Sequence, residues 1–336
     1  MNAYVLEAVN QLVYKDVALP ECPPGWAIIK VKAAGICSSD IPRIFKKGTY
    51  HFPTIPGHEF AGIVVDVNGD RKDLIGKHVG VFPLIPCKTC TQCFRKRYEL
   101  CQNYDYIGSR RDGGFAEFVA VPIWNLIEVN SEVPFEELAV MEPLSVALHA
   151  VKQARIEKDT QFGIIGTGMI GFAAAQWAEK LGSSFVTVLG RSYSKSDIAE
   201  KLSIDYLTLE NNRQKYDVVL EAVGSAESVN VAIEATKSGG TLILMGNPAG
   251  DILLKQDTYW QILRKQLTVK GTWNSSYNYH ETSDWSEVVH TLETRTIQVR
   301  PLISHIFSQE KLAYGLDIMK NHTQPYCKIM TLWNED

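Results

Sequence analysis

The sequence predicts an α/β protein in two parts, a β-rich domain and a domain built on a doubly wound parallel sheet. Up to about residue 145 the chain holds short alternating or β-branched runs separated by Gly and Pro, the pattern of a β-rich domain. From about Glu142 helical apolar patterns alternate with short buried strands, which is typical of a parallel sheet with right-handed crossovers. A length of 336 residues also exceeds what one hydrophobic core usually organises.

The individual elements follow from these patterns in chain order. In the β-rich part we expect strands at 26–36, 60–67, 77–82 and 114–121. In the second part we expect a helix at 143–154, a strand, glycine turn and helix at 161–182, strands at 185–189, 216–223, 240–245 and 266–271, and a helix at 225–239. After about Trp273 the pattern is mixed, with helices expected near 284–294 and 310–321 and a strand near 301–307.

Composition and charge exclude several classes of protein. The residues are 45% hydrophobic and 21% charged, and the net charge of -4 is spread without blocks, which argues against a nucleic-acid partner. The N-terminal residues lack a basic end followed by an apolar run, and no apolar segment approaches the roughly 20 residues that span a bilayer. We therefore expect a cytoplasmic protein with no membrane partner.

Four of the seven cysteines crowd into fifteen residues with the spacing C-x2-C-x2-C-x7-C. These residues are Cys87, Cys90, Cys93 and Cys101, and four thiolates complete a closed tetrahedral Zn²⁺ site, so we expect a structural zinc here. The alternatives are an iron–sulfur cluster, a redox pair or a coincidence of spacing. The basic "FRKRY" inside this lobe is typical of a nucleic-acid zinc ribbon, but no wider basic surface accompanies it.

A second, more dispersed set of metal-ligating residues indicates an open metal site. The set comprises Cys37 in "GICSSD", His58 and Glu59 in "PGHEF", and Glu142 in "MEPLS". One thiolate, one imidazole and carboxylates suit a catalytic zinc that keeps a position for water or substrate. Ser39 is then placed to relay a hydroxyl proton, and Asp40 to orient His58. Taken singly, each residue is a weak indication, because a lone Cys is usually a small buried core residue and a lone His-Glu pair usually lies in a loop.

The sequence "GTGMIG" follows a predicted strand and opens a predicted helix, as a dinucleotide-binding loop does. Its glycines are Gly166, Gly168 and Gly171, and the pyrophosphate is expected at the helix N-terminus. The next strand ends in Gly190, Arg191 and Ser192 where an NAD site presents a carboxylate, so NADP is favoured over NAD. The alternative is that Arg191 points to solvent and both cofactors bind. The candidate cofactor contacts also include Thr167, Met169, Ile170, Val223 and Gly246.

Two adjacent arginines, Arg110 and Arg111, stand in the turn "YIGSRRDGGFAEF", and Arg43 follows the predicted zinc cysteine closely. Arginine clamps a carboxylate or phosphate with two parallel hydrogen bonds, so either group is a candidate for binding an anionic substrate. Trp273 is a further, weaker candidate for substrate contact. The alternative is that the arginines are solvated surface charges.

With these motifs together, the chain resembles the zinc-containing medium-chain dehydrogenases over essentially its whole length. "SDIPRIFKKG", "YDYIGSRRDGGFAEF" and "ILRKQLTVKGTW" resemble the branch that acts on sugar-alcohol phosphates. The resemblance implies a GroES-like catalytic domain at 1–146 with a structural zinc lobe at about 84–105, a Rossmann domain at 147–275, and a return to the catalytic domain at 276–336. It also implies two zinc ions per chain and a homodimer or homotetramer built through the Rossmann domains. The catalytic zinc ligands would be Cys37, His58 and Glu142, with Glu59 as a fourth or exchanging ligand.

The expected reaction is the reversible, zinc-dependent, NADP-preferring oxidation of a secondary alcohol on a polyol phosphate to a ketose phosphate. The alternatives are a dehydrogenase of free polyols or vicinal diols, such as sorbitol, xylitol or butanediol, and an idle cofactor-binding or sensor protein on the same fold. The sequence departs from the alcohol dehydrogenases at Pro42, because they carry at this position the histidine that ends a proton relay. The proton must therefore leave either through Ser39, the cofactor ribose and water, or by another route. The segment between the strands at 185–189 and 216–223 is also short for the helices that usually cross there.

Overall fold

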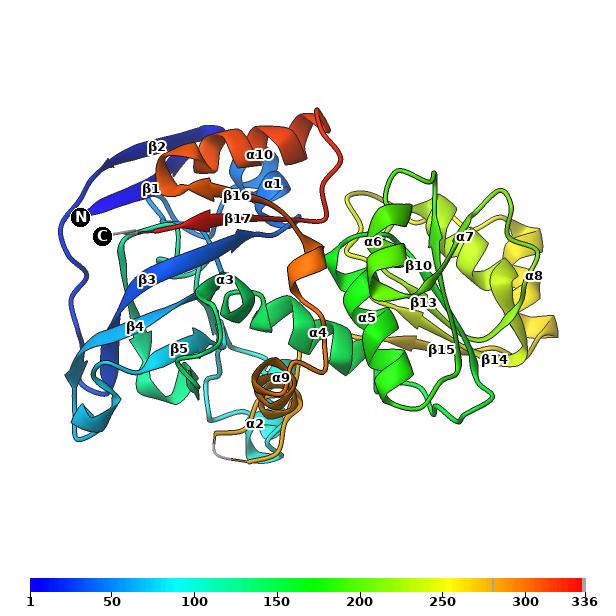
Figure 1. Ribbon diagram of the computed structural model, residues 1–336, viewed down its shortest axis with the longest axis horizontal. Helices are drawn as coiled ribbons and strands as arrows, with labels where there is room; N and C mark the ends of the chain where they lie inside the picture. The colour runs from blue at the N-terminus through cyan, green and yellow to red at the C-terminus, as the bar shows by residue number, and fades with distance from the viewer. Residues whose placement is uncertain (280, 334–336) are drawn as a thin grey trace. The chain divides into compact units, whose positions relative to one another are not determined.

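Residues 1–279 and 281–333 are described by the structure, a computed structural model, and they fall into two units (Figure 1). Unit 1 comprises Met1–Glu142, Ser276–Thr296 and the stretch from Ile303 to the end of the described chain. Unit 2 comprises Pro143–Ser275 and Ile297–Leu302. Among the described residues, no helix combines the length and the apolar character that crossing a membrane requires.

A seven-stranded sheet is the framework of unit 1 in the described chain. In spatial order its strands are β16 (Ile303–Ser308), β17 (Lys328–Leu332), β3 (Trp26–Ile36), β4 (Glu59–Asn68), β5 (His78–Val81) and β9 (Leu126–Val129), with β8 (Phe118–Pro122) paired to β3. Neighbouring strands are antiparallel except β16 and β17. Strand β3 is buried over most of its length, since it pairs with three strands and its apolar side chains line the core of unit 1.

Smaller elements surround this sheet. They are the hairpin of β1 (Asn2–Ala8) and β2 (Gln11–Asp16), the pair of β6 (Leu84–Ile85) and β7 (Asp105–Tyr106), and the helices α1 (Asp40–Pro42), α2 (Thr91–Phe94), α3 (Phe135–Leu138), α9 (Asp284–Glu293) and α10 (Leu312–Asn321). Helix α4 (Met141–Val151) carries the chain from unit 1 into unit 2. In Figure 1, α10 runs beside β16 and β17.

Unit 2 holds a parallel sheet, which confirms the predicted α/β fold class. In spatial order its strands in the described chain are β12 (Asp205–Thr208), β11 (Phe185–Gly190), β10 (Gln161–Ile165), β13 (Tyr216–Glu221), β14 (Thr236–Leu244) and β15 (Thr268–Gly271). The crossing helices are α5 (Met169–Lys180), α6 (Ser196–Leu202), α7 (Ala226–Ala235) and α8 (Gln256–Arg264). The strand order reverses beside β10, so the loop that follows β10 lies at the switch point where doubly wound sheets bind ligands.

Besides elements for which the sequence analysis makes no prediction, such as β1, β2, β9 and β17, three differences between the observed and the predicted organisation concern unit 2. The helix predicted at 225–239 ends at Ala235, because Thr236 pairs with Tyr216 and already belongs to β14. The short segment before β13 holds one helix and one strand, α6 and β12. Residues 297–302 group with unit 2 rather than with the return segment, since Gln298 N–H donates to Gln176 Oε1 at 2.7 Å and its carbonyl accepts from Gln176 Nε2 at 3.1 Å.

Candidate metal and cofactor sites

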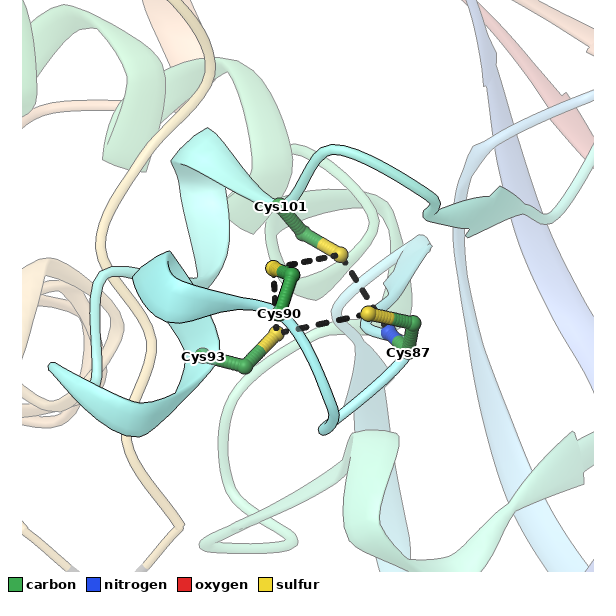
Figure 2. A group of neighbouring side chains, drawn as sticks. All are labelled: Cys87, Cys90, Cys93 and Cys101. Atoms are coloured by element: carbon green, nitrogen blue, oxygen red, sulfur yellow. Dashed lines mark hydrogen bonds between the residues drawn. The ribbon is translucent and has the colours of Figure 1, made fainter.

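The four clustered cysteines converge on one point (Figure 2). Three of the Sγ–Sγ distances are 3.6 Å for Cys90–Cys93, 3.9 Å for Cys87–Cys93 and 4.0 Å for Cys90–Cys101. Four sulfurs bound tetrahedrally to zinc at about 2.3 Å lie about 3.8 Å from one another, so the observed spacing fits a zinc ion. All four thiols are free of disulfides. The donor set and its spacing fit a closed, structural zinc site.

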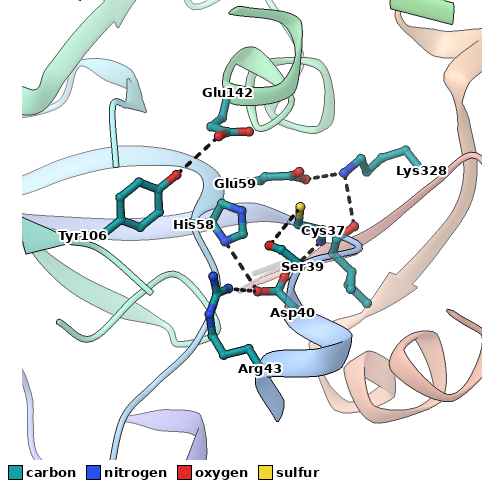
Figure 3. Close-up of polar contacts among 10 residues, drawn as sticks. Cys37, Ser39, Asp40, Arg43, His58, Glu59, Tyr106, Glu142 and Lys328 are labelled. Atoms are coloured by element: carbon teal, nitrogen blue, oxygen red, sulfur yellow. Dashed lines mark hydrogen bonds and ion pairs between the residues drawn. The ribbon is translucent and has the colours of Figure 1, made fainter. Parts of the chain in front are cut away.

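Cys37, His58 and Glu59 form a second group, with ligand atoms that all lie within 4.8 Å of one another. The sheet explains how they meet. Cys37 directly follows β3 and His58 directly precedes β4, and these strands are antiparallel with Gly35 opposite Glu59. The end of one strand and the start of the next are therefore at the same edge (Figure 3). One thiolate, one imidazole and one carboxylate fit a zinc site that is not closed by its protein ligands.

The buried Asp40 carboxylate lies behind His58. Its Oδ1 is 3.5 Å from His58 Nδ1, an ion-pair distance without hydrogen-bond geometry, and 2.8 Å from Arg43 Nη1. Burial by itself raises the pKa of Asp40, but the charges of His58 and Arg43 outweigh it and lower the pKa. An ionised Asp40 behind Nδ1 leaves the other ring nitrogen to face the metal ligands, as in carboxylate–histidine–zinc arrangements (Figure 3).

Glu59 has a buried partner that the sequence analysis missed. Lys328 Nζ, at the start of β17, donates to Glu59 Oε2 and to the carbonyl of Ile36 at 3.1 Å. Both charged side chains are buried. Burial by itself lowers the pKa of Lys328, but the Glu59 carboxylate outweighs it and raises the pKa. The signal in the sequence was a single lysine at the head of the mostly apolar run "KIMTL".

Glu142 lies beside this group without joining it. Its Oε1 accepts a 3.4 Å hydrogen bond from the Tyr106 hydroxyl, and the Tyr106 ring is 5.9 Å from the His58 ring. Burial, with the nearby Glu59 charge, raises the pKa of Glu142 to about 7. Glu142 as a zinc ligand therefore stays a prediction, and Tyr106 is a further site residue that sequence reasoning did not identify.

Ser39, the predicted proton relay, lies next to Cys37. Its hydroxyl donates to Cys37 Sγ at 3.3 Å, and α1 begins at the next residue. The predicted residues of the open site, Cys37, Ser39, Asp40, His58, Glu59 and Glu142, are thus neighbours in unit 1 (Figure 3).

The glycine-rich loop in unit 2 has the form of a dinucleotide-binding turn. Gly166 follows β10 with φ +127°, and Gly168 caps the N-terminus of α5. A Cβ at Gly171 would lie 1.9 Å from the Gly166 carbonyl oxygen, so only glycine allows the helix to approach the strand this closely. The backbone N–H groups at the start of α5 suit the pyrophosphate of a dinucleotide, and the predicted Thr167, Met169 and Ile170 belong to this turn.

At the end of β11, the Tyr206 side chain would have to move to admit any side chain at position 190. A Cβ at Gly190 would lie 2.0 Å from the Tyr206 hydroxyl, which donates to the carbonyl of Ser192 at 2.6 Å. Arg191 and Ser192 follow on the exposed surface. Lys195 adds a second cation that sequence reasoning missed, with its Nζ donating to the Thr167 carbonyl at 3.0 Å.

The remaining predicted cofactor residues lie at the ends of the next two strands. Val223 N–H and Gly224 N–H both donate to Glu221 Oε1 at 2.8 Å, directly after β13. Gly246 follows β14, and its N–H donates to the Glu221 carbonyl at 3.0 Å. The carboxyl ends of β10, β11, β13 and β14 therefore carry all of the predicted cofactor residues, at one edge of a parallel sheet.

The predicted substrate residues have different environments. Arg43 pairs with Asp40, and Arg111 pairs with Asp105 and lies 5.3 Å from the Trp26 ring. Arg110 is stacked between tyrosine rings. Trp273 is an exposed residue of unit 2, after β15.

Two family models match the chain. The model described as the alcohol dehydrogenase GroES-like domain matches residues 23–131, and the model described as zinc-binding dehydrogenase matches residues 170–294. The first match covers the open metal site in part and the whole cysteine lobe, and the second begins within the glycine-rich loop.

Known proteins are similar along nearly the whole chain. Galactitol 1-phosphate 5-dehydrogenase of Escherichia coli strain K12 is 35% identical over 307 residues, covering 87% of this chain and 89% of that protein. The crystal structure of galactitol-1-phosphate dehydrogenase from Escherichia coli superposes with a TM-score of 0.89 at 32% identity, covering 99% of this chain and 100% of that one. D-altritol 5-dehydrogenase of Agrobacterium fabrum is 29% identical, covering 91% of this chain and 92% of that protein. A zinc-binding dehydrogenase from Sinorhizobium meliloti, solved bound to NADP, has a TM-score of 0.89 at 28% identity, covering 98% of each chain.

Proposed function

This chain belongs to the family of zinc-binding alcohol dehydrogenases with a GroES-like domain, and we propose that it oxidises a secondary alcohol of a polyol phosphate to a ketose phosphate. The substrate would be of the galactitol 1-phosphate or pentitol phosphate type, and the hydride acceptor would be NADP. The observation that carries the proposal is the convergence of Cys37, His58 and Glu59 in a chain that also carries a dinucleotide-binding turn. An idle cofactor-binding protein would have no use for such an open set of ligands.

The residues of unit 1 would hold the catalytic zinc through Cys37 Sγ, His58 and a carboxylate of Glu59 or Glu142. A zinc ion bound there supplies Lewis-acid chemistry, lowering the pKa of a substrate hydroxyl so that the adjacent carbon releases hydride. Asp40 and Arg43 fix the orientation of the His58 ring. Lys328 holds the Glu59 carboxylate through its Oε2 atom, and its positive charge balances part of the negative charge of the metal ligands.

Ser39 Oγ would move the hydroxyl proton. Its hydroxyl is already directed at Cys37 Sγ, 3.3 Å away, which keeps it beside the metal ligands. Pro42 has no ionisable side chain, so the proton cannot pass to a histidine at that position. We propose that it continues through the cofactor ribose to water.

Unit 2 would bind the dinucleotide, which accepts the hydride at its nicotinamide ring. NADP is favoured, because Tyr206 occupies the space that an acidic side chain at Gly190 would need, and Arg191, Ser192 and Lys195 offer donors for a 2′-phosphate. The relative from Sinorhizobium meliloti holds NADP, which supports the same choice. NAD is the alternative cofactor.

The substrate class rests on two observations. The galactitol 1-phosphate enzyme from Escherichia coli is similar along most of the chain, and unit 1 carries a guanidinium, that of Arg110, that forms no ion pair with a carboxylate of the described residues. A second candidate function is the oxidation of free polyols. The similarity to D-altritol 5-dehydrogenase favours it, since that relative is named for an unphosphorylated polyol.

We also propose that two copies associate through the edge of the unit 2 sheet. Strand β15 ends the described sheet, and all four of its residues are exposed. Exposed apolar side chains accompany this edge on α8, namely Tyr259, Trp260 and Leu263. An open strand edge with apolar neighbours is a ready template for pairing with a second strand.

The test is the rate of NADP⁺ and NAD⁺ reduction by zinc-loaded protein on matched pairs of polyols and their phosphates, galactitol and pentitols included. The proposal expects the phosphates to give the higher kcat/KM by about 10-fold or more, because a charge-assisted contact to arginine is lost with the phosphate. Equal values for free and phosphorylated polyols would favour the free-polyol function instead.

A further inference from the structure

The turn that carries Arg110 and Arg111 is fastened to the loop that carries His58. Ile55 N–H donates to Asp112 Oδ1 at 2.8 Å, and Gly113 N–H donates to the Ile55 carbonyl at 2.7 Å. A Cβ at Gly113 would lie 2.1 Å from the Gly57 carbonyl oxygen, so the two backbones touch. The arginine turn is therefore held at a fixed place beside the open metal site, although some fifty residues separate it from His58 in the sequence.

A series of aromatic contacts leads from the metal ligands to the turn. The Tyr106 ring lies 5.9 Å from the His58 ring, and its hydroxyl donates to Glu142. The Tyr104 ring packs edge-on against Tyr106, with 6.2 Å between ring centroids. Arg110 follows in this series, since its Cζ lies 4.4 Å from the centre of the Tyr104 ring.

Two tyrosines hold the Arg110 guanidinium in place. Tyr50 lies 4.2 Å from Cζ, Nη1 donates to the Tyr104 carbonyl at 2.7 Å, and Nη2 donates to the Tyr50 hydroxyl at 3.3 Å. Stacking of this kind fixes the plane of a guanidinium and leaves its charge intact. The fork is thus oriented before any ligand arrives, and less side-chain entropy is lost when one binds.

The three arginines proposed from sequence differ in what neutralises them. Arg43 is paired with Asp40 and Arg111 with Asp105. Arg110 forms no ion pair with any described residue, and its Nε is buried without a hydrogen-bond partner there. A partly buried guanidinium that forms no ion pair keeps its charge for an anion, because Asp105, the carboxylate that interacts with it electrostatically, is already paired with Arg111.

We infer that Arg110 binds the phosphate of the substrate, and that Arg43 and Arg111 do not. The inference rests on the proposed polyol phosphate function and assigns its specificity to one residue. Tyr50 is 70% exposed and contributes only the longer of the two hydrogen bonds, so its hydroxyl is the group that yields to a phosphate oxygen. Arg43 instead positions Asp40, and Arg111 fastens the turn through Asp105.

The test compares galactitol 1-phosphate with galactitol in the wild-type enzyme and in Arg110→Gln, Arg110→Lys and Arg95→Gln. Arg95 is an exposed arginine of the cysteine lobe and controls for the loss of one positive charge. Arg110→Gln is expected to lower kcat/KM for the phosphate about 10- to 100-fold, mainly through KM, and to leave kcat/KM for galactitol within about two-fold. Arg110→Lys keeps the charge but loses the fork, so we expect an intermediate KM.

The outcomes separate this inference from the proposed function. If the wild-type enzyme itself shows no preference for the phosphate, the proposed function fails. If the wild type prefers the phosphate and Arg110→Gln keeps that preference, the assignment of Arg110 is overturned while the function stands. Arg111→Gln is the competing assignment, and loss of the preference there instead of in Arg110→Gln also overturns the inference. Should Arg110→Gln not fold, a KM for the phosphate that is unchanged in Arg110→Lys counts against Arg110.

Discussion

Cys37 is the residue on which turnover should depend most directly, since it supplies the thiolate of the open metal site. We expect Cys37→Ser to lower kcat at least about 100-fold, because the Lewis acid contributes several kcal/mol to the transition state and each 1.4 kcal/mol is about ten-fold. The fold should persist, because Cys37 lies in a turn after β3 and carries no core packing. The measurements are kcat, zinc content and the circular dichroism spectrum.

Cys22→Ser serves as the matched control for that variant. Cys22 is a partly exposed thiol that belongs to neither metal group, and its Sγ donates to the Trp26 carbonyl at 3.4 Å. The Cys22→Ser variant should keep the zinc content and the kcat of the wild-type protein. A normal rate in Cys37→Ser would exclude the catalytic zinc assignment.

Lys328 should matter for stability as well as for the site, because it is the buried partner of a buried carboxylate. Lys328→Met removes the buried cation with which the Glu59 carboxylate is paired, and removing one partner of such a pair typically costs about 3–5 kcal/mol. Urea unfolding of the zinc-loaded protein measures this free energy. The double variant Lys328→Met with Glu59→Gln should recover much of the loss, since no unpaired charge remains. A loss below about 1 kcal/mol in the single variant would show that Glu59 finds another partner.

Arg191 decides between cofactors if it binds the 2′-phosphate. Arg191→Ala should raise the KM for NADP by about 10- to 100-fold and change the KM for NAD little, because NAD lacks the phosphate that the guanidinium would bind. Steady-state kinetics with both cofactors measure the ratio. Arg155→Ala, another exposed arginine of unit 2, is the control. An equal increase in KM for NADP and for NAD would rule out a role of Arg191 in binding the 2′-phosphate.

At the scale of the element, the cysteine lobe should be needed for stability and not for chemistry. The lobe has no regular core of its own, since α2 spans only four residues, so four thiolates and a zinc ion must hold it together. Cys93→Ser should lower the Tm by about 5–10 °C and remove one zinc, while kcat at low temperature stays within about two-fold. Thermal unfolding and zinc analysis test this. A large loss of kcat with an unchanged Tm would contradict a purely structural zinc.

The strand order is the other decisive property at this scale. Strands β3 and β4 run antiparallel, and this arrangement places the end of the first beside the start of the second. The ligands Cys37 and His58 are thereby neighbours, although twenty residues separate them. In the parallel sheet of unit 2, the carboxyl ends of the strands share one edge, which explains why the predicted cofactor residues follow different strands and still meet.

At the scale of the whole molecule, the exposed edge strand β15 predicts self-association. Val269→Asp places a charge on that edge, where a two-fold partner would bring a second copy of the same charge close to it. We expect the molar mass from light scattering to fall toward that of a single 37.6 kDa chain, with a dissociation constant raised about 10-fold or more.

Val65→Asp is the control for that experiment. Val65 on β4 is exposed to the same degree, 40% against 41% for Val269, but β4 has strands on both sides. The mass of this variant should equal that of the wild type. If the wild-type protein has the mass of a monomer at every concentration, the proposed dimer is wrong.

The sequence alone predicted the fold class, which the structure confirms, and it supplied the residue types from which the metal and cofactor sites are proposed. The four cysteines and the glycine-rich turn are local motifs, so their spacing in the chain already fixes what they can bind. The alternation of helical and strand patterns likewise predicted a parallel sheet in the second part of the chain. The error at Thr236 arose because strand pairing with Tyr216, a contact made across the sheet, ended the helix earlier than its own pattern indicated.

Only the tertiary structure decided how charges are paired. Lys328 reaches Glu59 from 269 residues away, because β17 lies next to β3 in the sheet. The sequence offered Arg43, Arg110 and Arg111 as equals, and only their surroundings distinguish the two paired guanidinium groups from the one held between tyrosine rings. A side chain's type sets the interactions it is able to make, but its partner depends on which distant strands and turns become neighbours on folding.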